Sequence, residues 1–230
     1  MKPDELAKLI GVEEIEVKKF LAKEEITSKF FNYEDKKWEL KIKRLGDITL
    51  SLLLIFLTMP LIALIAILIK LEDGGPIFYV QKRVGLNFSK FKIVKLRSMK
   101  IDAEQNKAQW SYKGDPRITT IGKFIRKTRI DEIPQLLTVL KGEMSLIGPR
   151  PERPEFIEIL EKKITNYGIR CQIKPGLSGW AQVNYPYGSS IKDAEIKLSY
   201  DTFYIKNFSF YLDLLIMIKT IKIIILHKGT

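Results

Sequence analysis

The apolar stretch ITLSLLLIFLTMPLIALIAILI at residues 48–69 runs for 22 positions without a charged side chain. As an α-helix it would extend about 33 Å at 1.5 Å per residue, which is enough to cross the hydrocarbon core of a bilayer. A helix buried in a soluble protein is the alternative reading. The length and the richness in Leu and Ile favour contact with a membrane instead.

Two features of this stretch favour a helix that enters the bilayer and returns to the same side. Pro60 lies at its middle, where proline removes a backbone hydrogen bond and kinks a helix. A helix that crosses the membrane is expected to have a basic bias on one side only. Here basic residues flank both ends, namely Lys36, Lys37, Lys41, Lys43 and Arg44 before the stretch and Lys70, Lys82 and Arg83 after it. The pattern therefore predicts a re-entrant helix-break-helix with Pro60 as the break.

Composition limits the chemistry that the chain can perform. The 230 residues have a net charge of +12, and residues 1–40 are acidic, so the basic excess belongs to the rest of the chain. Such an excess suits anionic lipid or phosphorylated substrates. Cys171 is the only cysteine and His227 the only histidine. This scarcity weighs against a Ser-His-Asp triad, a Cys-His pair and a multi-His zinc site, and favours carboxylates, Lys, Tyr or Ser for nucleophilic work.

Residues 1–40 read as an arm of short polar helices. Ala7, Gly11 and Val17 fall at the offsets of a helix-turn-helix, so a DNA-binding head is one alternative. Such a head is expected to be basic, whereas this arm is acidic. We therefore favour an amphipathic arm that packs on the main domain, and we expect no nucleic-acid partner.

The rest of the chain predicts a mixed domain. Residues 76–81 and 91–96 are rich in Ile, Val, Phe and Tyr and predict two short strands joined by a turn. The other expected elements are a polar loop at 102–117, helices at 121–129, 131–141 and 155–166, an ordered loop at 174–184, and an amphipathic tail at 208–226. Gly142 is expected to end the second of these helices.

The most chemically informative run is DEIPQL at residues 131–136, which follows a basic helix and precedes GPRP at 148–151. Asp131 and Glu132 open a helix, and ordinary helix capping is the alternative role for both. A carboxylate at a helix N-terminus among arginines stays ionised, as a nucleophile or an Mg²⁺ ligand must. Arg150, fixed between two prolines, can bind phosphate oxygens through two nitrogens. For Asp201 we expect a structural pairing with an arginine.

These residues resemble the monotopic phosphoglycosyl transferases, the bacterial initiating sugar transferases of capsule, exopolysaccharide and glycoprotein assembly. The resemblance covers roughly residues 43–225. Its motifs are KRLGD at 43–47, the proline-broken apolar stretch, QKRVGLN at 81–87, KLRSM at 95–99, DPR at 115–117, DEIPQL at 131–136, GPRP at 148–151, KPGLSG at 174–179 and AQVN at 181–184. So many motifs in one order are specific to the family, and the later ones are most similar to exopolysaccharide-type members.

The resemblance implies a reaction and a set of partners. A sugar-1-phosphate would pass from a UDP-sugar to undecaprenyl phosphate, with Mg²⁺, releasing UMP. Partners would be the donor, the undecaprenyl phosphate acceptor and membrane lipid, and a homodimer is left open. The enzyme would act at the cytoplasmic face of the bacterial inner membrane, held in one leaflet.

The resemblance also implies roles for individual residues. Asp131 would be the nucleophile that takes the phosphosugar, with Glu132 as its partner carboxylate, and both would be metal ligands. Lys95, Arg126 and Arg150 would bind the substrate phosphates, and Pro60 would be the break in the membrane helix. Two features depart from the family pattern: Met59 stands where a small polar residue often precedes the proline, and a polar arm replaces the N-terminal membrane helices of larger relatives.

Together these expectations give an α+β fold, mostly helical with a small β-hairpin, a re-entrant membrane helical hairpin and amphipathic interfacial helices. The expected domains are a polar arm at 1–40, the re-entrant segment at 41–74 and a cytoplasmic catalytic domain at 75–230. Two other functions stay open from the sequence: a membrane-anchored DNA-binding regulator, and a structural scaffold of an export complex.

Overall fold

A computed structural model describes residues 31–103, 111–112, 114–186, 188 and 190–226 of the chain. The short helices expected within residues 1–30, the helix-turn-helix offsets around Ala7 and the histidine at 227 lie outside these ranges. In chain order the elements are α3 (Lys37–Asp73), β1 (Phe78–Val84), η1 (Leu86–Phe88), β2 (Lys90–Leu96), α4 (Thr120–Lys127), η2 (Ile130–Gln135), α5 (Leu136–Lys141), β3 (Ser145–Ile147), α6 (Pro154–Lys163), η3 (Tyr167–Gln172), β4 (Gly176–Ser178), α7 (Trp180–Asn184), α8 (Ile191–Lys206) and α9 (Phe210–Ile225), where η marks a 3₁₀ helix.

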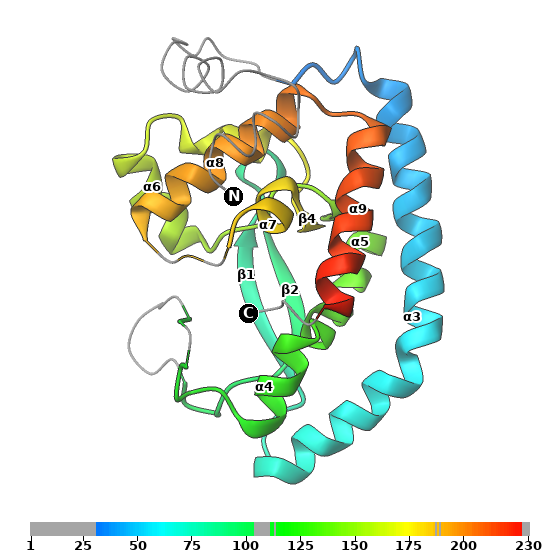
Figure 1. The fold of residues 1–230 in the computed structure, drawn as a ribbon, viewed down its shortest axis with the longest axis vertical. Helices are drawn as coiled ribbons and strands as arrows, with labels where there is room; N and C mark the ends of the chain where they lie inside the picture. The colour runs from blue at the N-terminus through cyan, green and yellow to red at the C-terminus, as the bar shows by residue number, and fades with distance from the viewer. Residues whose placement is uncertain (1–30, 104–110, 113, 187, 189, 227–230) are drawn as a thin grey trace.

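The apolar stretch forms the centre of α3, a single helix of 37 residues with Pro60 inside it. Figure 1 shows that α3 bends along its length, so that its second half runs obliquely beneath the rest of the molecule. Proline inside a helix is an established cause of such a bend. The two expected arms are therefore joined as one bent helix, which ends at Gly74 in the left-handed conformation with φ of 72°.

Most of α3 is not covered by the rest of the described chain. Only 11% of its most apolar 18-residue window is buried, so α3 is not the core helix of a soluble domain. Its exposed apolar side chains include Leu52, Leu53, Phe56, Leu57, Leu64, Ile67 and Leu71. By length and composition α3 could cross a bilayer.

A few polar contacts join the start of α3 to the domain. Arg44 donates to the carbonyl oxygens of Val139 and Leu140, at 2.6 and 2.7 Å, and so satisfies the C-terminal end of α5. Asp47 is buried and accepts hydrogen bonds from the Ser145 hydroxyl and the Leu146 amide. The KRLGD motif is therefore an anchor for α3.

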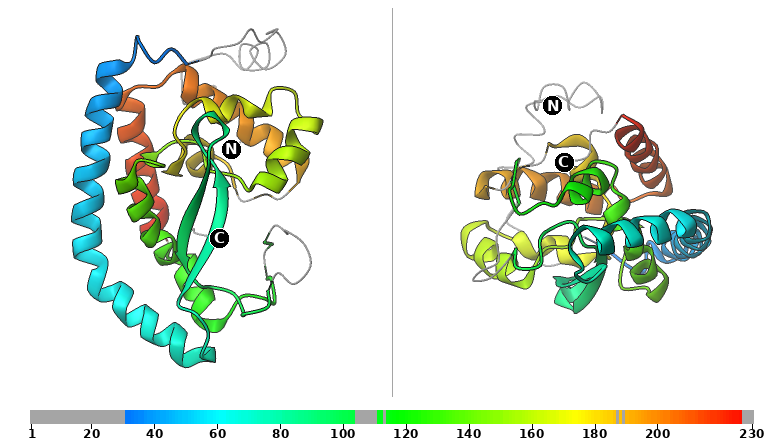
Figure 2. Two further views of the ribbon diagram at one scale, coloured as in Figure 1. Left: turned by 180° about the vertical axis from the view of Figure 1, so that it is seen from behind. Right: turned by 90° about the horizontal axis from the view of Figure 1, so that it is seen from below.

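The predicted hairpin is confirmed. Strands β1 and β2 are antiparallel with Phe78 opposite Leu96 and Val84 opposite Lys90, and the turn places Asn87 and Phe88 at positive φ. Figure 1 shows the hairpin at the centre of the molecule, with α3 and α9 on one side and α6 and α8 on the other. Figure 2, from behind, shows the same order.

The segment at residues 174–184 is regular, so the prediction of a loop there was wrong. Strand β4 pairs in parallel with β3, with Ser145 opposite Gly176, and α7 follows at once. A Cβ at Gly176 would lie 2.0 Å from the Gly148 amide nitrogen. Glycine here lets two backbones approach closely, and it does not mark irregular structure.

The predicted helices are present, with shifted ends. Residues 121–129 correspond to α4, 155–166 to α6, and 208–226 to α9, whereas the helix predicted at 131–141 is divided into the 3₁₀ helix η2 and the short α-helix α5. The sequence reading assigned no helix to α8, which starts with a capping box between Ser190 and Asp193. Helices α8 and α9 pack around the main core through Tyr204, Ile205 and Ile216, so α9 buries one face in the domain.

Candidate active site

The Asp-Glu pair lies in η2, between β2 and the loop after β3. The chain enters η2 through Arg129, which adopts the left-handed conformation with φ of 61° and whose side chain caps nothing. Asp131 and Glu132 are each 7% exposed. Helix α5 follows and ends at Gly142, whose φ is 84°, as predicted. The simple capping role does not apply, because neither carboxylate caps the helix and Glu132 points to other partners.

Glu132 is held by cations from separate parts of the chain. Its Oε1 accepts from Lys95 Nζ of β2 at 2.7 Å and from an Arg150 guanidinium nitrogen at 2.5 Å. Its Oε2 has longer contacts, 3.4 Å to Arg150 and 3.8 Å to Arg129. Burial acts to raise the pKa of Glu132, but the charges of Arg150 and Lys95 outweigh it and hold this pKa well below its ordinary value. Glu132 is therefore ionised and joins the strand, the helix and the GPRP loop.

Asp131 differs from its neighbour. Within the described ranges its carboxylate has neither a hydrogen bond nor an ion pair, although Lys95, Arg126 and Arg129 are near enough to act on it by charge. Burial, and then the adjacent charge of Glu132, raise the pKa of Asp131 to about 6. A buried carboxylate without a partner is costly to keep charged, which is typical of groups that act on a ligand.

Both carboxylates line a cavity of about 920 Å³. This volume is within the range of small-molecule sites. Its wall comes from the hairpin, the end of α4, η2, the GPRP loop, α7 and α8. The predicted site residues that line it are Lys95, Arg126, Asp131, Glu132 and Arg150. The structure thus brings together all the predicted residues except Pro60, which lies in α3.

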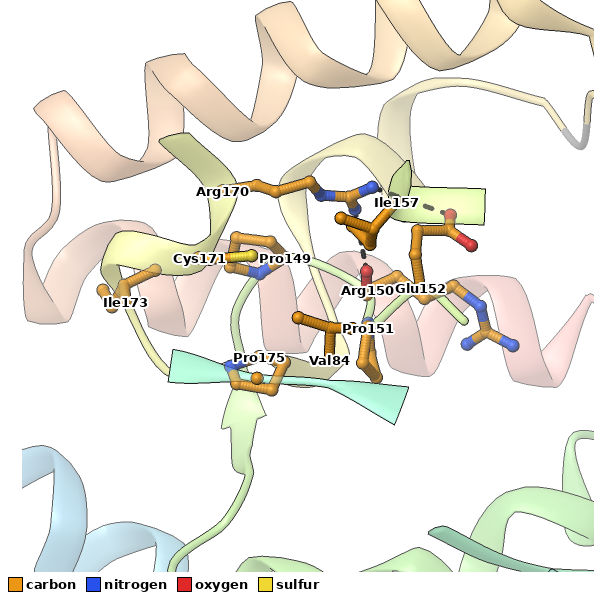
Figure 3. Close-up of a pocket in the computed structure, with 11 residues that line it drawn as sticks. Val84, Pro149, Arg150, Pro151, Glu152, Ile157, Arg170, Cys171, Ile173 and Pro175 are labelled. Carbon is orange, nitrogen blue, oxygen red and sulfur yellow. Dashed lines mark hydrogen bonds and ion pairs between the residues drawn. The ribbon is translucent and has the colours of Figure 1, made fainter. Parts of the chain in front are cut away.

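The sequence reading missed one cation that supports the GPRP loop. Arg170 of η3 is buried, donates to the Arg150 carbonyl oxygen at 2.7 Å and lies 3.6 Å from the Glu152 carboxylate. Figure 3 shows its guanidinium pointing at these two groups, beside a cavity of about 10 Å³ behind the loop. Arg170 also pairs with Asp201 at 2.9 Å, so the expected arginine partner of Asp201 is confirmed. No motif in the sequence separates Arg170 from other surface-type arginines.

Arg126, near the C-terminus of α4, is also held by residues that the sequence did not single out as partners. Its guanidinium donates to the Ser111 hydroxyl at 2.9 Å, and Ser111 lies 3.4 Å from the Asp115 carboxylate. Asp115 is buried and accepts from Arg117 at 2.9 and 2.6 Å. The DPR motif thus stabilises the segment that contacts Arg126, a role that the sequence reading did not assign.

The carboxylates at the cavity suit a magnesium ion that takes most of its ligands from water and substrate phosphates. Mg²⁺ is usually bound by one or two carboxylates, with water and substrate phosphates completing its coordination. The described residues offer no group of three or more metal-ligating side chains. Asp131 and Glu132 supply two carboxylates at the cavity, and Glu132 Oε2 is only weakly engaged. The residues present therefore fit this mode of binding.

The cysteine of the chain, Cys171, does not line this cavity. Cys171 is buried beside the small cavity behind the loop, and burial raises the pKa of its thiol to about 11. A thiol in that state is inert. Within the described residues Asp131 is thus a carboxylate without a hydrogen bond or ion pair among several cations, which suits attack on, or metal-assisted binding of, a phosphorylated ligand.

Three known proteins show what the chain is similar to. A protein of Aeromonas hydrophila named UDP-N-acetylgalactosamine-undecaprenyl-phosphate N-acetylgalactosaminephosphotransferase is 49% identical over 82% of this chain and 44% of its own length. An undecaprenyl-phosphate glucose phosphotransferase of Komagataeibacter xylinus is 39% identical over 81% of this chain and 36% of its own. A UDP-glucose:undecaprenyl-phosphate glucose-1-phosphate transferase of Caulobacter vibrioides is 38% identical over 78% and 68%.

The chain spans less than half the length of the first two of these relatives. The sequence profile of the bacterial sugar transferases matches residues 38–227, which include α3 except its first residue and every residue of the cavity named above. The chain therefore belongs to the bacterial sugar transferase family.

Proposed function

We propose that this protein transfers a sugar-1-phosphate from a UDP-sugar to undecaprenyl phosphate, giving undecaprenyl-diphosphate-sugar and UMP. The observation that carries the proposal is the Asp131 carboxylate, which has no hydrogen bond or ion pair to the described residues and lines a cavity of about 920 Å³ with the cations Lys95, Arg126 and Arg150. The names of the related transferases support the donor and acceptor classes. A membrane step of exopolysaccharide, capsule or glycoconjugate synthesis is the expected setting.

The proposed reaction has two steps that use Asp131 in turn. First, an Asp131 carboxylate oxygen attacks the phosphorus that bears the sugar, a P–O bond forms, and the bond from that phosphorus to the UMP oxygen breaks. Second, a phosphate oxygen of undecaprenyl phosphate attacks the same phosphorus and the Asp131 carboxylate leaves. This division would let a soluble donor and a lipid acceptor use one cavity in succession.

The cations supply the charge that both steps need. Lys95 and Arg150 are held within 2.7 Å of Glu132, so their positions are set before a ligand arrives. Preorganised cations stabilise the negative charge that a transferring phosphoryl group carries. Mg²⁺ held by Asp131 and Glu132 would neutralise diphosphate oxygens when bound.

A turnover assay tests the proposed function. Purified protein is mixed with Mg²⁺, undecaprenyl phosphate and one nucleotide sugar at a time, starting with UDP-N-acetylgalactosamine and UDP-glucose, the donors suggested by the names of the relatives. We expect UMP to be released, and we expect repeated turnover only when undecaprenyl phosphate is present. Absence of UMP with every UDP-sugar would contradict the proposal and favour the scaffold or regulator alternatives.

Replacing Arg150 with lysine is expected to lower kcat/KM roughly tenfold or more, a loss of about 1.4 kcal/mol of transition-state stabilisation. Lysine keeps the charge but cannot place two nitrogens on one partner as Arg150 does on Glu132. The thermal midpoint is measured in parallel and is expected to change little. Near-normal turnover of Arg150→Lys would assign Arg150 a structural role only.

For the membrane we propose that α3 is re-entrant and that residues 75–230 lie in the cytoplasm. The bend, the exposed apolar side chains and the basic residues at both ends support this placement. The lipid phosphate acceptor lies at headgroup level, where a helix that enters only one leaflet could hold the cavity.

Cysteine labelling tests the placement of α3. Single cysteines at Lys41 and Lys82, in a Cys171→Ser background, are expected to react with an impermeant thiol reagent from the same side of the membrane. Both positions are exposed, Lys41 near the start of α3 and Lys82 in β1, so they lie on either side of the apolar stretch in the chain. Labelling from opposite sides would mean that α3 spans the bilayer. In the companion variant Pro60→Leu we expect a straighter helix, because leucine restores the missing backbone donor.

A further inference from the structure

The last turn of α3 carries two adjacent carboxylates, Glu72 and Asp73. The C-terminal end of a helix favours cations and disfavours acidic side chains, because of the helix dipole. Lys70, in the same turn, is the residue that suits this end, and it donates to the Gly74 carbonyl oxygen at 2.5 Å. The two acids therefore destabilise the end of α3 itself. Any stabilising role that they have comes from the residues that they contact.

Asp73 binds the end of strand β2. Its two carboxylate oxygens accept from the two terminal nitrogens of Arg97, each at 2.5 Å. Arg97 is 6% exposed, and it also donates to the carbonyl oxygens of Pro76 and Met99. The hydrogen bond from Arg97 is the main cause that lowers the pKa of Asp73 to about 2, so the pair is charged at neutral pH.

Glu72 binds the start of helix α4. Its Oε1 accepts from the backbone amides of Thr120 at 2.7 Å and Ile121 at 3.2 Å. The Thr119 hydroxyl accepts from the next amide, that of Gly122, at 2.9 Å. Glu72 thus completes the cap of a helix far away in the chain, where an acidic group is favoured.

The three elements meet at one tightly packed point. A Cβ at Gly122 of α4 would lie 2.0 Å from the Ser98 carbonyl oxygen, just after β2. A Cβ at Gly75, just after α3, would lie 2.8 Å from an Arg97 guanidinium nitrogen. These distances show that α3, the end of β2 and α4 are closely packed against one another at this point.

Strand β2 and helix α4, which the end of α3 contacts, each carry a cation that lines the cavity. Arg97 follows directly after the last residue of β2, two positions from Lys95, and both side chains line the cavity. Helix α4 carries Arg126 near its C-terminus, and the chain then runs directly into Arg129 and Asp131. The final turn of α3 is therefore connected to Lys95 through β2 and to Arg126 through α4.

We propose that Glu72 and Asp73 are positioning residues, through which the end of the membrane helix sets the placement of the phosphate-binding cations. This inference rests on the proposed function, since it concerns the cations assigned there. Neither acid lines the cavity, so each acts through its partner: Asp73 through Arg97 and β2, and Glu72 through α4 and Arg126.

Glu72 provides the cleaner test, because Asp73→Asn would leave the buried Arg97 charge without its partner and endanger folding. Glu72→Ala removes the acceptor for two amides, whereas Glu72→Gln keeps an amide oxygen there. We expect Glu72→Ala to lower kcat/KM for the UDP-sugar roughly tenfold, and Glu72→Gln to stay within about threefold of the natural protein. Glu158→Ala, at an exposed position of α6, is the matched control and is expected to match the natural protein.

A double-variant cycle separates positioning from loss of stability. If Glu72 acts through Arg126, the effect of Glu72→Ala should shrink to within about twofold when it is measured in an Arg126→Lys background. A purely structural loss would reduce activity by the same factor in both backgrounds, which would overturn the proposal. Activity of Glu72→Ala equal to that of Glu158→Ala would also overturn it. UMP release by the natural protein is measured first, since its absence would refute the proposed function, whereas the outcomes above concern positioning alone.

Discussion

Replacing Asp131 with asparagine is expected to lower the rate of UMP release roughly a thousandfold or more, the scale seen when a catalytic nucleophile is removed. Asparagine has nearly the same shape, but its neutral amide cannot form the ester with phosphorus. The variant should fold normally. Because burial raises the pKa of Asp131, the charged form is more costly in the folded chain than in the unfolded one at neutral pH, and a neutral side chain removes that cost.

The control for this prediction is Glu158→Gln, an acid-to-amide exchange at an exposed position of α6. It should match the natural protein in UMP release and in thermal midpoint. Asp131→Asn should match it in thermal midpoint but not in UMP release. Turnover by Asp131→Asn within about tenfold of the natural rate would exclude Asp131 as nucleophile.

The variant Glu132→Gln is expected to lower kcat roughly a hundredfold or more while the donor binds at least as tightly as before. Glu132 accepts from Lys95 and Arg150 through one oxygen. Glutamine keeps an oxygen there but loses the negative charge, and its NH2 group would face Arg150 where Oε2 now accepts. Removing the negative charge makes the cavity more positive, which favours an anionic diphosphate. The cations would lose their fixed positions, which the transition state requires.

Separate measurements of donor affinity and turnover test this prediction. Binding of UDP is measured calorimetrically and kcat from UMP release, with Glu158→Gln again as control. A fall in affinity with unchanged kcat would mean that Glu132 serves binding alone. It would then not be the residue that holds Lys95 and Arg150 ready for the reaction.

The hairpin and α3 could be predicted because their signals are local. Enrichment in Ile, Val and Phe predicts β2, whose buried Phe91 and Ile93 pack against Val139 and Met144. An uncharged apolar run fixes α3. The course of α3 could not be predicted in detail, since Pro60 removes one hydrogen bond but does not decide how far the helix bends or whether it breaks.

The β4–α7 segment was misread because its signal is not local. Glycine and proline at residues 174–179 read as a loop from propensity alone. Gly176 is required instead by the approach of Gly148, which lies 28 positions earlier in the chain. A contact between two distant backbones leaves no periodicity in either segment, so no single-sequence pattern reveals it.

The residues of the candidate site likewise divide into those with a local sequence signal and those without one. Lys95, Asp131, Glu132 and Arg150 stand in recognisable motifs, and Arg126 was assigned from the family resemblance; the structure places all five on one cavity. The supporting residues Arg170 and Glu72 were not predicted. Each acts through a partner at least 20 positions away, Arg170 on the Arg150 carbonyl oxygen and Glu72 on the Thr120 amide. Only the tertiary arrangement separates such residues from ordinary surface charges.

The central claim is that Asp131 carries the phosphosugar between donor and acceptor, and a single-turnover experiment without acceptor tests it most directly. Protein, Mg²⁺ and the UDP-sugar that supports turnover are mixed in the absence of undecaprenyl phosphate, and UMP and the peptide containing Asp131 are measured. We predict about one UMP per protein molecule and an increase in the mass of that peptide by one sugar phosphate. UMP that forms only when the acceptor is present, with an unmodified peptide, would contradict the claim and indicate direct transfer from donor to lipid.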